Sequence, residues 1–158
     1  MMKKLPPIEK IYEAYSAIAD GRVTLKDDHA EVLSSDKTKT YTVSYVGNEY
    51  SSNDNATYWQ GYAGYPVIAV LMSQGKLPLN EKTAEQFKDI NWNQLNKLYK
   101  RDYDAAVQFA MNERKMAKDA IRKETEEIYD ALKDLDINIR RGKQRPPKSS
   151  ETEEKQGS

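Results

Sequence analysis

The chain has 158 residues, enough for one domain of ordinary size, and its 25 Lys and Arg balance its 25 Asp and Glu, so bulk charge attracts neither nucleic acid nor an acidic membrane. It has no Cys and a single His, His29, which excludes disulfides, Cys-ligated metals and a multi-His metal site within one chain. No stretch approaches the roughly 20 apolar residues of a membrane span, and the N-terminus lacks the apolar run of a signal peptide, so we expect a soluble, cytoplasmic protein without a membrane partner.

The first hundred residues predict a helix followed by a β-meander. After Pro6-Pro7, apolar residues recur at helical spacing up to Ala19, which predicts an amphipathic helix ending near Gly21. Three short β-rich runs at 22–25, 29–33 and 39–46 are separated by polar turns. In the last run, apolar and polar residues alternate, so we expect the sheet to bury one side.

The segment from Pro66 to Met72 is apolar all round, and Gly75 follows shortly after it as a helix-ending residue. This pattern predicts a short buried helix at the centre of the core. Thr83 with Gln86, and Asn91 with Gln94, match the capping pattern that begins a helix.

Residues 102–158 predict a helical segment followed by a tail. Between Asp102 and Leu135 there is neither Gly nor Pro, and a three-and-four apolar rhythm predicts one long helix, although Arg114 and Glu124 interrupt the apolar stripe. From residue 139 the chain is almost free of apolar side chains, which predicts disorder. The sequence therefore predicts an α+β fold: an N-terminal helix, a small antiparallel β-meander on a short buried helix, and a helical C-terminal half. Its expected divisions are a core at 1–101, a long helix at 102–138 and a disordered tail at 139–158.

The stretch from Gly21 to Leu77, about a third of the chain, resembles the SWIM-type zinc-binding domain. That family carries Cys-x-Cys, a spacer, and Cys-x-His at the head of a helix. The resemblance places the four ligand positions on Ser52, Asp54, Tyr65 and Val67. Because zinc needs about four nitrogen or sulfur donors, this set supplies at most one good ligand, and we expect no metal and no cofactor. The resemblance thus implies a degenerate form in which packing replaces the zinc.

The family is associated with DNA and protein partners, so the resemblance implies a nucleic-acid-binding accessory protein. Aromatic residues in the linker could stack on bases, and a basic run without acids could contact phosphates. Packing in the core and a merely solubilising tail are the competing interpretations. The predicted nucleic-acid-binding residues are Tyr58, Trp59, Tyr62, Arg140, Arg141, Lys143, Arg145 and Lys148.

The alternative is a protein-interaction module that uses the long charged helix, as a homodimer or with another protein. An enzyme is the least favoured class, because the sequence has no Gly-rich phosphate loop, Cys nucleophile or Ser-centred elbow. We therefore expect no catalytic residues.

Overall fold

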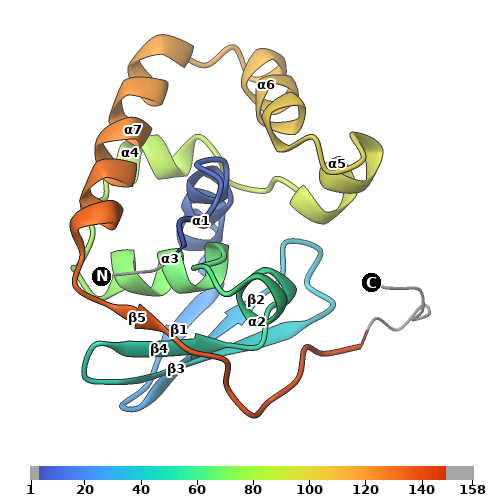
Figure 1. Ribbon diagram of the computed structural model, residues 1–158. Coiled ribbons are helices and arrows are strands. Elements are labelled where there is room, and N and C mark those ends of the chain that lie inside the picture. The colour runs from blue at the N-terminus through green and yellow to red at the C-terminus, as the bar shows by residue number, and fades with distance from the viewer. Residues whose placement is uncertain (1–3, 149–158) are drawn as a thin grey trace.

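The structure is a computed structural model that describes residues 4–148, and it shows a sheet with helices on one side (Figure 1). The predicted α+β class and its order of elements are confirmed. In chain order the elements are α1 (Lys10–Ala19), β1 (Val23–Leu25), β2 (His29–Leu33), β3 (Thr40–Val46), β4 (Glu49–Ser52), α2 (Asn55–Gln60), α3 (Tyr65–Ser73), α4 (Glu81–Glu85), α5 (Trp92–Leu98), α6 (Tyr103–Glu113), α7 (Lys118–Asp134) and β5 (Asn138–Ile139).

The sheet has the order β1-β2-β3-β4-β5, which makes the first four strands the predicted meander. These four pair antiparallel, with Ala30 opposite Val43 and Val43 opposite Ser52. Ala30 and Val43 are fully buried, whereas Ser44, one residue further along β3, is exposed. The alternation along the strands therefore buries one face of the sheet, as the sequence predicts.

Helix α3 is the predicted buried helix, and every residue from Pro66 to Met72 is buried. Gly64 caps its N-terminus in an extended conformation, and Gly75 follows its end with a φ of 77°, where a side chain would be strained. Because apolar side chains cover the whole surface of α3, it lies inside the core between α1 and the sheet (Figure 1).

The expected continuous helix over 102–138 is interrupted: α6 ends at Glu113 and α7 begins at Lys118. The break follows Arg114, the charged residue that interrupts the apolar stripe. Its guanidinium donates to the backbone carbonyls of Gln86 at 2.9 Å and Asp89 at 3.3 Å, and Lys115 takes a left-handed φ of 56°. Arg114 thus bonds to the segment after α4, and the chain turns at this point between α6 and α7. Apolar residues of both helices, including Met111, Ile128 and Leu132, belong to the same hydrophobic core as α1 and α3.

The expectation of disorder from residue 139 needs correction for residues 139–148. Strand β5 pairs parallel with β4, and the backbone N–H of Arg140 donates to the carbonyl of Tyr50 at 2.8 Å. Backbone hydrogen bonds with an open sheet edge do not require apolar side chains, so composition did not reveal them. The remainder of the predicted tail, 149–158, lies outside the described residues.

Among residues 4–148, no helix is both long and apolar enough to cross a membrane.

Candidate nucleic-acid interface

The segment after β5 returns to α2 and brings three predicted site residues together. The guanidinium carbon of Arg141 lies 4.9 Å from the ring centre of Tyr58 and 5.4 Å from that of Trp59, within cation–π distance of both. Arg141 Nε also donates to the Tyr58 carbonyl at 3.1 Å. We call Tyr58, Trp59 and Arg141 the aromatic–arginine site.

Only Trp59 offers an exposed aromatic surface in this site. Its side chain is 55% exposed, whereas Tyr58 is 8% exposed, and the two rings meet edge to face with centres 4.7 Å apart. The buried Tyr58 ring therefore packs against both Trp59 and Arg141. Part of the Trp59 indole and the exposed Arg141 face solvent. An indole beside a guanidinium is suited to stacking on a nucleobase and pairing with a phosphate.

Local capping explains the position of these two rings. The Asp54 carboxylate accepts from the backbone N–H of Thr57 at 3.0 Å and so begins α2. Gly61 ends α2 after six residues in a left-handed conformation with a φ of 76°. Because Tyr58 and Trp59 are adjacent within this short helix, they point to different environments, one buried and one exposed.

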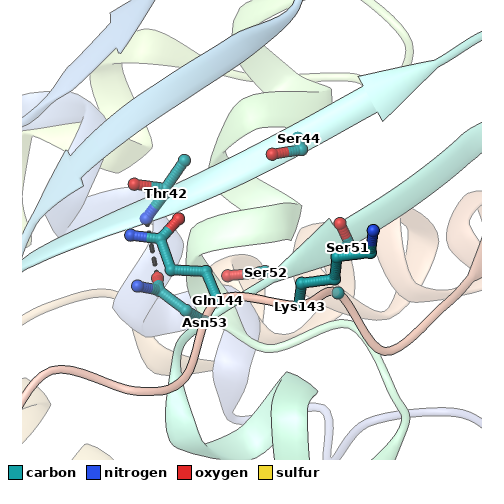
Figure 2. Close-up of a pocket in the computed structure, with 8 residues that line it drawn as sticks. Thr42, Ser44, Ser51, Ser52, Asn53, Lys143 and Gln144 are labelled. Atoms are coloured by element: carbon teal, nitrogen blue, oxygen red, sulfur yellow. Dashed lines mark hydrogen bonds between the residues drawn. The ribbon is translucent and has the colours of Figure 1, made fainter.

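A polar hollow of about 310 Å³ adjoins the segment after β5, on the open face of the sheet (Figure 2). The hydroxyl residues Thr42, Ser44 and Ser51 form its floor, and residues 142–144 form its side. Ser52 also lines it, but it lies opposite the buried Val43, and its hydroxyl bonds to Asp54. Asn53 closes one end: its Oδ1 accepts from the Thr42 N–H at 2.7 Å, and its Nδ2 donates to the Arg145 carbonyl at 3.4 Å. The residues that line it are Thr42, Ser44, Ser51, Ser52, Asn53, Gly142, Lys143 and Gln144.

Lys143 is the predicted site residue that lines this hollow. Figure 2 shows its side chain alongside Ser51, whereas Gln144 lies near Thr42 and Asn53. Gly142 packs closely there, because a Cβ on it would lie 3.1 Å from Ser51 Oγ. Hydroxyls and amides next to a lysine can donate hydrogen bonds to phosphate or sugar oxygens.

The remaining predicted site residues are placed differently. Arg140 pairs with Glu49 at 2.6 Å, which neutralises part of its charge. Arg145 is held through its backbone carbonyl, and Lys148 is exposed at the end of the described chain. Tyr62 corrects the expectation of an exposed aromatic linker, because it is only 9% exposed and burial raises the pKa of its hydroxyl.

The positions that the resemblance assigns to zinc ligands form hydrogen bonds and apolar contacts instead. Ser52 Oγ donates to Asp54 Oδ1 at 2.5 Å, Tyr65 packs edge to face on Tyr41, and Val67 is fully buried. Burial raises the pKa of the Tyr65 hydroxyl. Over residues 4–148 there is no group of three or more His, Cys, Asp or Glu side chains that could hold a metal ion.

Sequence reasoning did not assign the hydroxyl floor of the hollow to the site. The signal was present, since the polar alternate positions of β3 lie on the face opposite the core. What could not be seen is that the C-terminal segment would lie along this face and enclose it.

Residues 3–138 match a protein-family model described as uncharacterised conserved protein UCP014422. The comparison with curated proteins found no match. No solved structure matched either. The resemblance to SWIM-type domains consequently stays a prediction. Because the family model spans most of the 158 residues, the chain belongs to the UCP014422 family.

Proposed function

We propose that this protein is a non-catalytic accessory protein that binds nucleic acid, with DNA as the favoured ligand, through the aromatic–arginine site and the adjoining polar hollow. The observation that carries the proposal is the contact between the Arg141 guanidinium and the half-exposed indole of Trp59. The indole offers a surface for stacking, and the guanidinium offers a positive charge for a phosphate. Lys143 and several hydroxyl residues line the adjoining hollow and could contact the next part of the strand.

Single-stranded nucleic acid fits this arrangement better than a duplex. A lone indole can stack on a base only where that base is unstacked from its neighbours, as in single strands. The zero net charge of the chain means that attraction would be local and weak, with affinity set by Arg141, Lys143 and the stacked base.

The proposal is tested by the salt dependence of oligonucleotide binding. Fluorescence anisotropy would compare the natural chain with the double variant Arg141→Gln/Lys143→Gln. Loss of two phosphate contacts should weaken binding to a single strand and reduce the slope of log K against log salt by about 1.4. A control variant, Arg122→Gln/Lys133→Gln, removes the same charge from α7 and should bind as the natural chain does. No binding at low salt, or equal losses in both variants, would reject the proposal.

A protein-interaction module on α7 is the second candidate. Its exposed charges support a solvated helix surface more than a docking face, since Arg122 pairs with Asp119 at 3.7 Å and Lys133 with Asp130 at 3.3 Å on the same helix. Light scattering distinguishes the candidates: a dimer abolished by changes on α7 would favour this second one.

A further inference from the structure

A second hollow, of about 380 Å³, lies at the corner between α5 and α6. It is lined by Asn96, Lys97, Lys100 and Arg101, which span the last turn of α5 and the connection to α6. Three of these residues are exposed and Asn96 is half-buried, so the hollow is an open one at the surface.

Three of the four lining residues are cations, and no acid lines the hollow. Lys97, Lys100 and Arg101 are exposed, and none forms an ion pair with any residue from 4 to 148. The neighbouring Asp102 is engaged elsewhere, because its carboxylate accepts from the Ala105 N–H at 3.1 Å to begin α6. Lys97 lies in the last turn of α5, where the negative end of the helix dipole favours a cation. Lys100 and Arg101 lie beyond the helix, so the dipole does not account for the presence of all three cations.

The backbone at this corner is strained. Lys100 and Arg101 both have left-handed conformations, with φ values of 53° and 68°, which favour glycine or asparagine. The conformation is fixed by the Arg101 N–H, which donates to the Asn96 carbonyl at 2.7 Å, and by the Asp102 N–H, which donates to the Tyr99 carbonyl at 2.9 Å. Two long cationic side chains thus occupy positions where glycine would be less strained. Lys37, Asp89 and Lys115 share this conformation elsewhere, so the unpaired charges at the hollow, and not the strain alone, distinguish this corner.

Asn96, which lines the hollow, is hydrogen-bonded to α1. Asn96 Nδ2 donates to Glu13 Oε2 at 3.3 Å, and Glu13 in turn lies 3.6 Å from Lys10 Nζ. Lys10 and Glu13 are both buried, so this network is shielded from solvent. The position of Asn96 is therefore set before any ligand arrives, which lowers the entropic cost of binding.

We propose that this hollow binds a phosphate group, carried either by a small molecule such as a nucleotide or by a nucleic-acid strand. The guanidinium of Arg101 can form two parallel hydrogen bonds with phosphate oxygens, and the two lysines that line the hollow supply further positive charges. The proposal does not rest on the aromatic–arginine site, which lies on α2 and the segment after β5.

The test is an NMR titration of the ¹⁵N-labelled full chain with inorganic phosphate, AMP, adenosine and a short oligothymidylate. Phosphate-bearing ligands should shift the amide signals of residues 96–101, whereas adenosine should not. The variant Lys97→Gln/Lys100→Asn/Arg101→Asn should lose about tenfold or more in affinity. The control Lys37→Asn/Lys115→Asn/Lys123→Gln loses the same charge, includes two lysines with φ values of 64° and 56°, and should bind normally.

A second variant separates binding from folding. Arg101→Gly relieves a left-handed side chain and removes one cation, so it should raise Tm and weaken phosphate binding. Shifts with phosphate and AMP alone would assign the site to a small molecule, and shifts with the oligonucleotide alone would assign it to a strand; either supports the proposal. It is overturned if no phosphate-bearing probe shifts residues 96–101, or if the triple variant binds as tightly as the natural chain.

Discussion

The hydroxyl of Tyr15 on α1 lies 2.8 Å from Thr125 Oγ1 on α7, a buried contact between residues 110 positions apart. Thr125 in turn donates to the carbonyl of Ile121 at 2.8 Å, so the Tyr15 hydroxyl must be the donor in the contact between the two. Both residues are fully buried. This pair ties the C-terminal helix to the N-terminal one and makes α7 part of the core.

Thr125→Val should destabilise the fold more than Tyr15→Phe does. The valine leaves the buried Tyr15 donor without a partner, at a cost of about 1–3 kcal/mol, whereas the phenylalanine leaves Thr125 its bond to Ile121 and costs about 0.5–1.5 kcal/mol. Urea unfolding of both variants provides the free energies. Equal costs, or the reverse order, would contradict the assigned direction of the hydrogen bond.

Stability should fall as the pH rises above about 10. Burial raises the pKa of Tyr15, Tyr41 and Tyr65, so these hydroxyls stay protonated in the folded chain while the unfolded chain releases their protons near pH 10. Each contributes stability that is complete below pH 10 and falls by about 1.4 kcal/mol per pH unit above it. Urea unfolding between neutral and alkaline pH measures this slope.

Tyr65→Phe serves as the control for that slope. It removes one of the tyrosines whose pKa is raised by burial, so the loss of stability with pH should be shallower. At neutral pH the variant should be no less stable, because the buried Tyr65 hydroxyl has no hydrogen-bond partner among the residues that the structure describes. An unchanged slope would show that Tyr65 is not shielded from solvent.

Gly64→Ala should destabilise the fold by about 1–3 kcal/mol. A Cβ at this position would lie 2.3 Å from Asp54 Oδ2, and the buried Asp54 carboxylate cannot move away without losing its cap on α2. Thermal unfolding measures the effect. The control Asn55→Ala changes an exposed residue at the start of α2 and should stay near the natural Tm. A stable Gly64→Ala variant would mean that Asp54 can relocate.

A strong chelator should leave the melting temperature unchanged. Ser52, Asp54, Tyr65 and Val67 engage in hydrogen bonds and packing, so no metal is needed to hold this region together. The measurement is thermal unfolding with and without chelator, accompanied by metal analysis of the purified protein. One zinc per chain, or a large fall in Tm with chelator, would contradict this prediction.

The strongest local patterns in the sequence predicted their structures correctly. The alternation in β3 and the all-round apolar surface of α3 follow directly from burial on one face or on all sides. The Asn91 cap is confirmed, since its side chain accepts from the Gln94 N–H at 3.0 Å. Thr83 was wrongly expected to begin a helix: Asn80 caps α4, and the Thr83 hydroxyl bonds to Glu124 of α7. The Thr83 hydroxyl is therefore used in a contact with α7, and the side chain of Asn80 caps the helix instead.

The candidate site was only partly predictable. Trp59 and Arg141 could be named from residue type, but their contact depends on β5 pairing with the edge of β4, which is not encoded in local composition. The corner at Lys100 and Arg101 was missed because left-handed conformations of non-glycine residues are imposed by their surroundings. A count of charges along residues 97–101 would have pointed to it.

We expect Trp59 to stack on a base, and tryptophan fluorescence during titration with a short oligothymidylate tests this most directly. The chain has two tryptophans, and Trp92 is buried with its Nε1 bonded to Ser16 Oγ at 2.7 Å, so the ligand should affect Trp59 alone. We predict quenching in the natural chain and in the control Phe109→Ala, which alters an exposed ring on α6, and its loss in Trp59→Phe. Absence of quenching at low salt, or equal quenching in Trp59→Phe, would contradict the account.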